Sequence, residues 1–216
     1  MKARPILILL LFAASVLVLV WLYHASAGSS RKRAASPWQE TIADLDECSR
    51  DKHARSAQYT HFADIAEREN DRQSARLFRA MALSEGIQEQ NCVKALSRLG
   101  GTYVPPSKVV VFRNSTGENL ARSIDLEQHR FTERMCPQID RAVSAGNRYA
   151  AKMLIWSAAI GRQHVRLMQA RNPAACAAGP LDYAVCPVCG NIYDTEFCDH
   201  YCPHCLTGCK DFVWFR

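Results

Sequence analysis

The 216-residue sequence lacks any stretch in which basic and aromatic residues alternate. Its net charge of +6 is spread along the chain rather than concentrated in one region. Excess positive charge can favour binding to nucleic acid or anionic lipid. Because no basic-aromatic stretch is present, we interpret the positive charge as a contribution to solubility and predict no nucleic-acid partner. No internal repeat is evident either. The length is sufficient for one sizeable core and a small additional domain.

The sequence also lacks a recognisable disulfide framework, although it contains ten cysteines. Six of these are scattered at spacings from which no pairing follows: Cys48, Cys92, Cys136, Cys176, Cys198 and Cys209. The other four lie close together near the C-terminus. They give the strongest chemical signal in the sequence.

These four cysteines form two C-x2-C motifs separated by twelve residues: Cys186, Cys189, Cys202 and Cys205. Two cysteines at this spacing place both thiolates on one metal when a tight turn lies between them. Two such turns facing each other create a closed tetrahedral sulfur site. Paired disulfides or four free thiols are the alternative interpretation. The C-P-x-C form of both motifs favours the metal site.

Four sulfur ligands alone do not distinguish iron from zinc. The stretch Tyr183-Ala-Val-Cys-Pro-Val-Cys-Gly-Asn-Ile-Tyr193 resembles a rubredoxin-type domain, in particular the short rubredoxin at the end of rubrerythrin-family proteins. This resemblance implies one iron that passes single electrons. Leu206 departs from the pattern because it stands where a glycine is usual, and Cys198 and Cys209 are additional potential ligands. A structural zinc site therefore remains the alternative.

The N-terminal segment 6–23 is apolar and uncharged. It is just long enough to span a bilayer. We predict an uncleaved single-pass transmembrane anchor within residues 1–27. A cleaved secretory signal, giving a secreted or periplasmic protein, is the alternative. Basic residues lie on both sides of the segment, so the membrane orientation is not determined.

The middle of the chain predicts a mostly α-helical domain. A polar linker at 28–35 is followed by helices at about 36–69, 72–99, 115–145 and 147–171. An extended crossover separates the second helix from the third. Four long helices with one long crossover are typical of a ferritin-like bundle. We assign this bundle to residues 36–173 and the rubredoxin-like domain to residues 181–216.

The bundle also resembles the rubrerythrin family, so that the likeness covers about 180 residues of this sequence. The stretches that carry it are Ala75-Arg-Leu-Phe-Arg-Ala-Met-Ala-Leu-Ser-Glu85, Leu99-Gly-Gly101, Ser115-Thr-Gly-Glu-Asn-Leu120 and Ile155-Trp-Ser-Ala-Ala159. The order of bundle and cysteine-rich tail is also the family's order. The resemblance implies a di-iron centre in the bundle and a homodimer that brings a tail close to a bundle.

Only three of the seven ligand positions of such a di-iron centre keep a suitable residue: Glu85, Glu127 and His164. Each falls on the apolar stripe of its helix, which predicts an inward position. The alternative interpretation is that His164 is a hydrogen-bonded core residue without a metal, and that Glu85 and Glu127 lie at the edge of the stripe and reach water. Two carboxylates and one imidazole are too few for two irons.

Two of the lost ligand positions carry bases, Lys52 and Arg130. Two buried glutamates without metal would repel each other and protonate, whereas nearby cations would neutralise them. We therefore predict that Lys52 or Arg130 contacts Glu85 or Glu127 in an ion-pair network at the place of the di-iron centre. The alternative is that both bases point outward to solvent.

These observations predict a membrane-tethered protein that transfers single electrons through iron bound by the four cysteines, to or from an unidentified redox partner protein. The bundle would have lost its di-iron peroxidase chemistry. Two alternatives remain. The first is a peroxide-reducing oxidoreductase with a rebuilt metal site at Glu85, Glu127 and His164, and the second is a zinc-stapled interaction module.

Overall fold

A computed structural model describes residues 14–22, 36–171, 182–194 and 198–216. The chain divides into two compact units, residues 1–36 and 37–216. The linker predicted at 28–35 lies outside the described residues, as does Cys176.

The first unit contains one described helix, at residues 14–22. Within the part of the chain that the structure describes, no helix is long and apolar enough to cross a membrane. This finding overturns the predicted transmembrane segment and the predicted single-pass membrane localisation.

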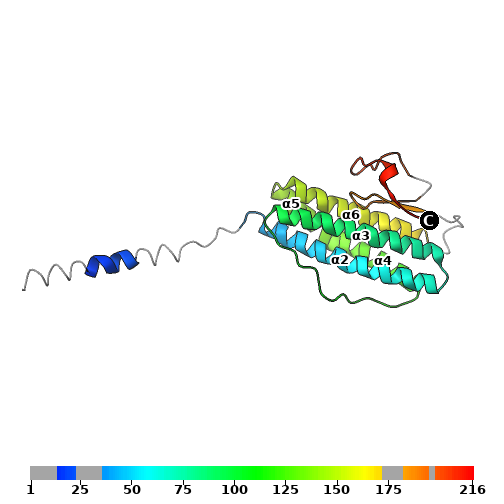
Figure 1. Ribbon diagram of the computed structural model, residues 1–216, viewed down its shortest axis with the longest axis horizontal. Coiled ribbons are helices and arrows are strands. Elements are labelled where there is room, and N and C mark those ends of the chain that lie inside the picture. Colours follow the sequence, from blue (N-terminus) through cyan, green and yellow to red (C-terminus); the bar gives the residue numbers. More distant parts are fainter. Residues whose placement is uncertain (1–13, 23–35, 172–181, 195–197) are drawn as a thin grey trace, which may run out of the picture. The chain divides into compact units, whose positions relative to one another are not determined.

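The second unit is built on a bundle of long helices (Figure 1). Its helices are α2 (Gln39–Arg68), α3 (Arg72–Arg98), α4 (Thr116–Arg130), α5 (Cys136–Ser144) and α6 (Arg148–Gln169). A five-residue π-helix, η1 (Phe131–Met135), joins α4 to α5. The predicted third helix is therefore a continuous run with a π-helical interruption, a feature that often accompanies functional sites.

The helix boundaries follow from local sequence signals. Ser115 and Glu118 form a reciprocal capping box at the start of α4. Asp71 and Asn147 cap α3 and α6 with their side chains. The tight turn between α5 and α6 uses Gly146, whose φ of 70° suits glycine.

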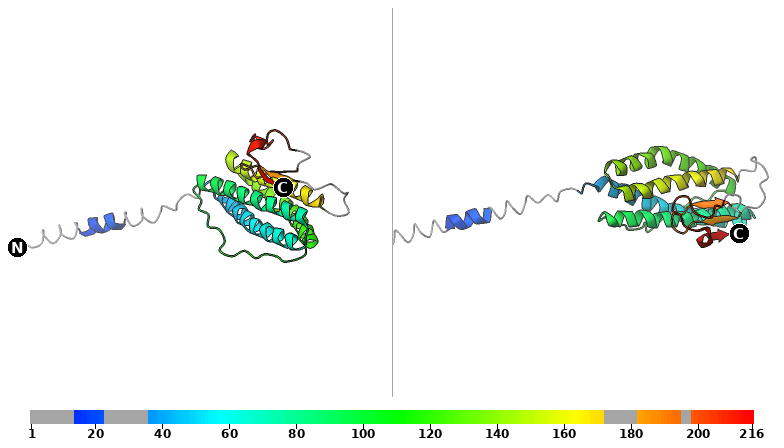
Figure 2. Two further views of the ribbon diagram at one scale, coloured as in Figure 1. Left: turned by 45° about the vertical axis from the view of Figure 1, so that its right-hand side comes forward. Right: turned by 90° about the horizontal axis from the view of Figure 1, so that it is seen from above.

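An extended crossover connects α3 to α4 along the outside of the bundle (Figure 2). Gln58 of α2 holds it there: its side chain accepts a hydrogen bond from the Phe112 backbone N–H at 2.8 Å and donates one to the Phe112 carbonyl at 3.2 Å. This confirms the predicted crossover between the second and third helices.

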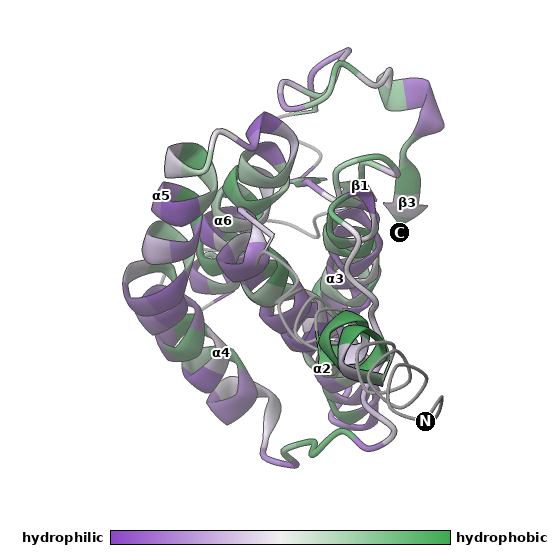
Figure 3. Ribbon diagram, turned by 90° about the vertical axis from the view of Figure 1, so that its left-hand side faces the viewer, coloured by the Kyte–Doolittle hydropathy of each residue, from purple (hydrophilic) through white to green (hydrophobic). Residues whose placement is uncertain are grey.

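Seen from one end, α4 and α5 present mainly hydrophilic residues on their outer side (Figure 3).

The C-terminal tail forms a small antiparallel sheet in the order β2-β1-β3. Its strands are β1 (Tyr183–Val185), β2 (Ile192–Asp194) and β3 (Val213–Phe215), with a short 3-10 helix, η3 (Cys209–Asp211), before β3. Strand β1 pairs with both neighbours, with Ala184 opposite Tyr193 on one side and Trp214 on the other.

The tail packs directly on α3 and α6 of the same chain. Tyr183, Val185 and Ile192 belong to the same buried apolar cluster as Phe78 and Met81 of α3. Burial of large apolar side chains stabilises such a contact by about 1.5–3 kcal/mol each. Bundle and tail therefore form one compact unit, which fixes the cysteine motifs relative to the bundle interior.

Candidate metal centre and buried charge network

The two cysteine motifs bring four sulfur atoms together at the edge of the small sheet. The Sγ atoms of Cys186, Cys189, Cys202 and Cys205 all lie within 4.8 Å of one another. The Cys186–Cys205 and Cys189–Cys202 pairs are each 3.4 Å apart. A tetrahedron with metal–sulfur bonds of about 2.3 Å has sulfur–sulfur edges of about 3.8 Å. A small shift of these side chains thus gives a tetrahedral thiolate site, and the donor set fits iron or zinc.

The two motifs have equivalent turns. The backbone N–H of Gly190 donates to the carbonyl of Cys186 at 2.9 Å, and that of Leu206 donates to the carbonyl of Cys202 at 2.7 Å. Gly190 has a φ of 85° and Leu206 a φ of 63°. Leu206 thus adopts the left-handed conformation for which the family pattern has glycine. Its side chain does not alter the path of the second turn.

Hydrogen-bond donors surround the sulfur atoms. The Tyr193 hydroxyl donates to Cys202 Sγ at 3.2 Å, and the Asn191 backbone N–H lies 3.5 Å from Cys189 Sγ. Such donors stabilise thiolate charge. Three of the cysteines are fully buried, whereas Cys205 is partly exposed. Cys198 and Cys209 pack nearby but are not members of the four-sulfur group.

A second constellation lies inside the bundle, where the sequence predicts an ion-pair network. Lys52 of α2 places its Nζ 3.0 Å from the Glu85 carboxylate of α3 and donates a hydrogen bond to Gln88 at 2.7 Å. Lys52 is 2% exposed and Glu85 is fully buried. Gln88 lies three residues after Glu85 on α3, so one buried ammonium group contacts two side chains of the same helix.

Arg55 completes this network and was missed by the sequence interpretation. Its guanidinium lies 3.0 Å from the Glu85 carboxylate and forms an ion pair with Glu127. Lys52 and Arg55 lie three residues apart on α2 and hence on one helical face, a spacing that could have identified Arg55. With both glutamates ionised, two cations and two carboxylates balance.

Arg130 lies at the edge of the network rather than in its centre. Its guanidinium is 4.0 Å from Glu127 but 3.2 Å from Asp51. Its side chain is 18% exposed. Arg130 therefore closes the network towards solvent, and Arg55 contacts Glu127 more closely.

The electrostatics favour the charged form of Glu85. Burial opposes its ionisation, but the charges of Arg55 and Lys52 outweigh burial and hold the pKa of Glu85 well below its ordinary value. Burial, together with Arg55, lowers the pKa of Lys52, and Glu85 offsets part of this effect.

His164 of α6 connects the network to the tail. It is fully buried, with Nδ1 3.3 Å from Glu85 and Nε2 3.0 Å from Ser84 Oγ. Burial lowers the pKa of His164. The Ser84 hydroxyl also donates to the carbonyl of Gly190 at 2.5 Å. A continuous run of polar contacts thus leads from Glu85 through His164 and Ser84 to the residue that follows Cys189.

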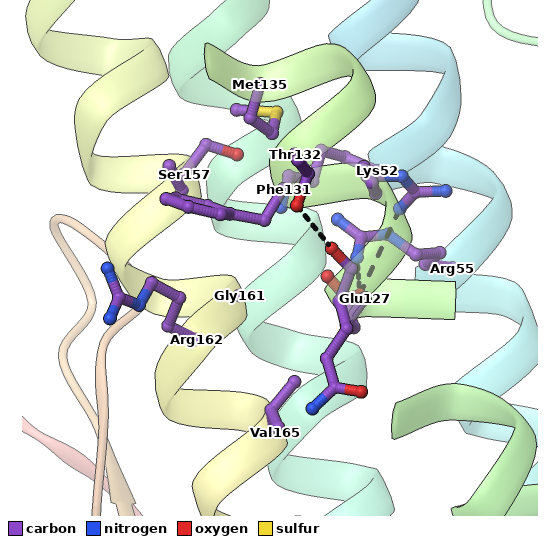
Figure 4. Close-up of a pocket in the computed structure, with 13 residues that line it drawn as sticks. Lys52, Arg55, Glu127, Phe131, Thr132, Met135, Ser157, Gly161, Arg162 and Val165 are labelled. Atoms are coloured by element: carbon purple, nitrogen blue, oxygen red, sulfur yellow. Dashed lines mark hydrogen bonds and ion pairs between the residues drawn. The ribbon is translucent and has the colours of Figure 1, made fainter. Parts of the chain in front are cut away.

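A pocket of about 340 Å³ opens beside the network, between α4, η1 and α6 (Figure 4). Lys52, Arg55 and Glu127 lie along one side of it, and Gly161 of α6 contributes to another. A Cβ at this position would lie 3.1 Å from the Glu127 carboxylate, so Gly161 leaves room for the carboxylate as it is placed here.

Comparisons with known proteins agree with this architecture. No protein-family model and no curated protein matches the chain. Three solved structures of nigerythrin do match it, in a mixed-valence, a fully reduced all-ferrous and a partially reduced state. Their TM-scores are 0.72, 0.70 and 0.72, at 24% sequence identity, over 86% of this chain and 90% of theirs. The resemblance to the rubrerythrin family is thereby confirmed at the level of the fold: this chain has the rubrerythrin-type fold of nigerythrin, with a four-cysteine cluster in its tail.

Proposed function

We propose that this protein is a one-electron carrier of rubrerythrin type, whose single iron is held by Cys186, Cys189, Cys202 and Cys205. The observation that supports this proposal is the four-sulfur cluster. Iron bound by four thiolates supplies one-electron chemistry. The protein's own contribution is to bury three of the ligands and to direct hydrogen-bond donors at the sulfur atoms, two factors that tune such a site.

We further propose that the bundle holds no di-iron centre. The carboxylates that remain from such a centre, Glu85 and Glu127, are engaged by Lys52 and Arg55 at ion-pair distance. A metal ion would have to displace these cations or share a buried space with them. Like charges at such short range are strongly unfavourable in a low-dielectric interior. The same contacts argue against a rebuilt peroxide-reducing metal site at these residues.

The proposed route for electrons enters at the second cysteine motif. Cys205 is partly exposed, and the neighbouring Leu206 and Tyr201 are 76% and 62% exposed. The first motif faces the bundle instead, because Asn91 of α3 donates to the carbonyl of Val188 at 2.8 Å. A redox partner protein would therefore approach the Cys205 side of the tail.

Metal analysis and visible spectroscopy of the purified full chain test this proposal. We expect about one iron per chain and a red ferric form that dithionite bleaches, as expected of iron held by four thiolates. Cys186→Ser should abolish the colour because it removes one of four ligands. Cys136→Ser is the matched control, since Cys136 is not among the clustered cysteines and lies on α5.

Three outcomes would contradict the proposal. A colourless protein with one zinc per chain would identify a zinc-stapled module. Close to three irons per chain would show that the bundle also binds iron. Full metal occupancy in Cys186→Ser would mean that the ligand set is different, with Cys198 and Cys209 as the next residues to replace.

A further inference from the structure

Two cysteines outside the four-sulfur cluster meet in the bundle core. Cys48 of α2 and Cys92 of α3 have Sγ atoms 3.1 Å apart. They are 3% and 1% exposed, respectively. A disulfide has a sulfur–sulfur bond of about 2.0 Å, so closing the remaining gap of about 1 Å would join the two helices. The sequence spacing of 44 residues gave no indication of this pair.

The surroundings of the two thiols differ. The pKa of Cys48 is lowered to about 7, chiefly by hydrogen bonding with Cys92. Burial opposes this effect, whereas the charge of Lys52 and the hydroxyl of Ser157 add to it. Hydrogen bonding with Cys48 and burial raise the pKa of Cys92 well above its ordinary value. Cys48 lies one helical turn before Lys52 and two turns before Arg55, on the cationic face of α2. The position of Cys48 on the helical face that carries Lys52, with the hydroxyl of the pocket residue Ser157 3.8 Å from its sulfur, assigns Cys48 as the nucleophile and Cys92 as its partner.

Access to the pair is restricted to small molecules. Both side chains are buried, so a protein disulfide or a glutathione-sized disulfide cannot reach either sulfur. However, Ser157 lines the 340 Å³ pocket and its Oγ lies 3.8 Å from Cys48 Sγ. Lys52 lines the same pocket. A hydroperoxide small enough to enter this pocket (Figure 4) is therefore separated from the thiol by one small side chain.

We propose that Cys48 and Cys92 form a redox-active dithiol that reduces a small hydroperoxide and closes into a disulfide. The Cys48 thiolate attacks the terminal peroxide oxygen, the O–O bond breaks, and the leaving alkoxide or hydroxide takes up the proton that Cys48 had released. Cys48 becomes a sulfenic acid. The sulfur of Cys92 then attacks Cys48, an S–S bond forms, and the sulfenic oxygen leaves as water with the Cys92 proton. Overall, two thiols and one hydroperoxide give one disulfide, one alcohol or water, and one water.

Hydrogen peroxide added to the full chain, with its four-cysteine site loaded with zinc so that those thiols are occupied, provides the test. After a stoichiometric dose, quenching, unfolding and alkylation, peptide mass spectrometry should show one Cys48–Cys92 cross-linked peptide. In Cys92→Ser the reaction should stop at a Cys48 sulfenic acid that dimedone traps. In Cys48→Ser no cross-link should form and Cys92 should remain alkylatable. Cys136→Ser is the matched control and should cross-link as the unaltered chain does.

Wild-type mapping alone is sufficient to overturn the proposal, whether or not the variants fold. If Cys48 and Cys92 both remain free thiols in excess hydrogen peroxide while the partly exposed Cys136 oxidises, the pair is a structural contact only. Dimedone labelling of Cys92 rather than Cys48 would equally refute the assigned roles. Because the zinc-loaded site takes no part, the result is independent of the proposed electron-carrier function.

Discussion

Replacing Lys52 by methionine tests whether the buried charge network stabilises the bundle as a unit. Methionine retains much of the length of lysine but not its charge. The change leaves the Glu85 carboxylate, which is fully buried, without one of its two close cations. Breaking a buried ion pair by removing one partner costs about 3–5 kcal/mol. We expect the lower end, about 3 kcal/mol, because Arg55 still lies 3.0 Å from the same carboxylate.

The assay is chemical denaturation of the full chain, followed by helical circular dichroism, in Lys52→Met and in a matched control on the same helix. Arg50→Met is that control. Arg50 pairs with Asp46 at 2.8 Å, which is shorter than the 3.0 Å Lys52–Glu85 contact, but the Arg50 side chain is 47% exposed. Solvent screens such a surface pair. We therefore expect Arg50→Met to leave the unfolding midpoint nearly unchanged.

A double variant separates the charge from the packing. Adding Glu85→Gln to Lys52→Met removes the carboxylate that the first change left underpaired. The double variant should be less destabilised than the sum of the two single variants, because the residues share one network. If Lys52→Met shifts the midpoint no more than Arg50→Met does, or if the two changes are additive, the network does not stabilise the fold in the way described.

Three further predictions concern pH and the tail. Folding lowers the pKa of Glu85 from its ordinary value of 4.5, so the stabilisation from its charge is complete above pH 4.5. This stabilisation is lost as the pH falls below 4.5 towards the lower pKa of the folded chain. In an acid titration, Glu85→Gln should therefore lose stability less steeply than the unaltered chain. Gly190→Ala should loosen the tail from α3, because the φ of Gly190 is 85° and a Cβ there would lie 2.8 Å from the Ser84 carbonyl oxygen. Faster limited proteolysis of the tail would measure this effect. Gly208→Ala is the control and should not change the rate, since a Cβ at Gly208 would have no neighbour closer than 3.8 Å. Leu206→Gly should stabilise the tail by about 1–2 kcal/mol, since a non-glycine residue pays a steric penalty at positive φ, and an unchanged thermal midpoint would contradict this reasoning.

Much of the fold could be predicted because the signals are local. Hydrophobic periodicity, the capping box at Ser115 and the turn at Gly146 determine where helices begin and end. The C-x2-C spacing brings each pair of thiols together through a turn of a few residues. The predicted transmembrane segment at residues 6–23 was wrong because hydropathy alone was used, and no described helix meets the length and apolarity required.

The candidate site in the bundle could be predicted only in part because its contacts join distant segments. The Lys52–Glu85 contact was expected because both residues occupy positions that the family resemblance assigns to one centre. Arg55 corresponds to no family ligand, so the resemblance gave no reason to consider it. Arg130, the other cation of that prediction, lies 4.0 Å from Glu127 and closer, at 3.2 Å, to Asp51 at the edge of the network. The Cys48–Cys92 pair depends on the relative rotation of α2 and α3, which helical periodicity alone does not fix.

The last prediction follows from the contrast between the two sites and concerns metal removal. In the bundle, Lys52 and Arg55 balance the buried carboxylates without any metal. In the tail, four thiols converge in a sheet of three three-residue strands, a domain too small to fold well without its metal. A chelator should therefore disorder the tail while the helices persist.

Two spectroscopic measurements on the same full-length sample distinguish these responses. Fluorescence should change on chelation, because Trp214 lies in β3 and Trp156 packs against the cysteine cluster. Far-UV circular dichroism should retain its helical signal, with the bundle somewhat less stable to denaturant because Tyr183, Val185 and Ile192 leave the shared apolar cluster. Loss of the helical signal on chelation would show that the bundle also depends on metal, and the neutral ion-pair network would then not be a replacement for a metal centre.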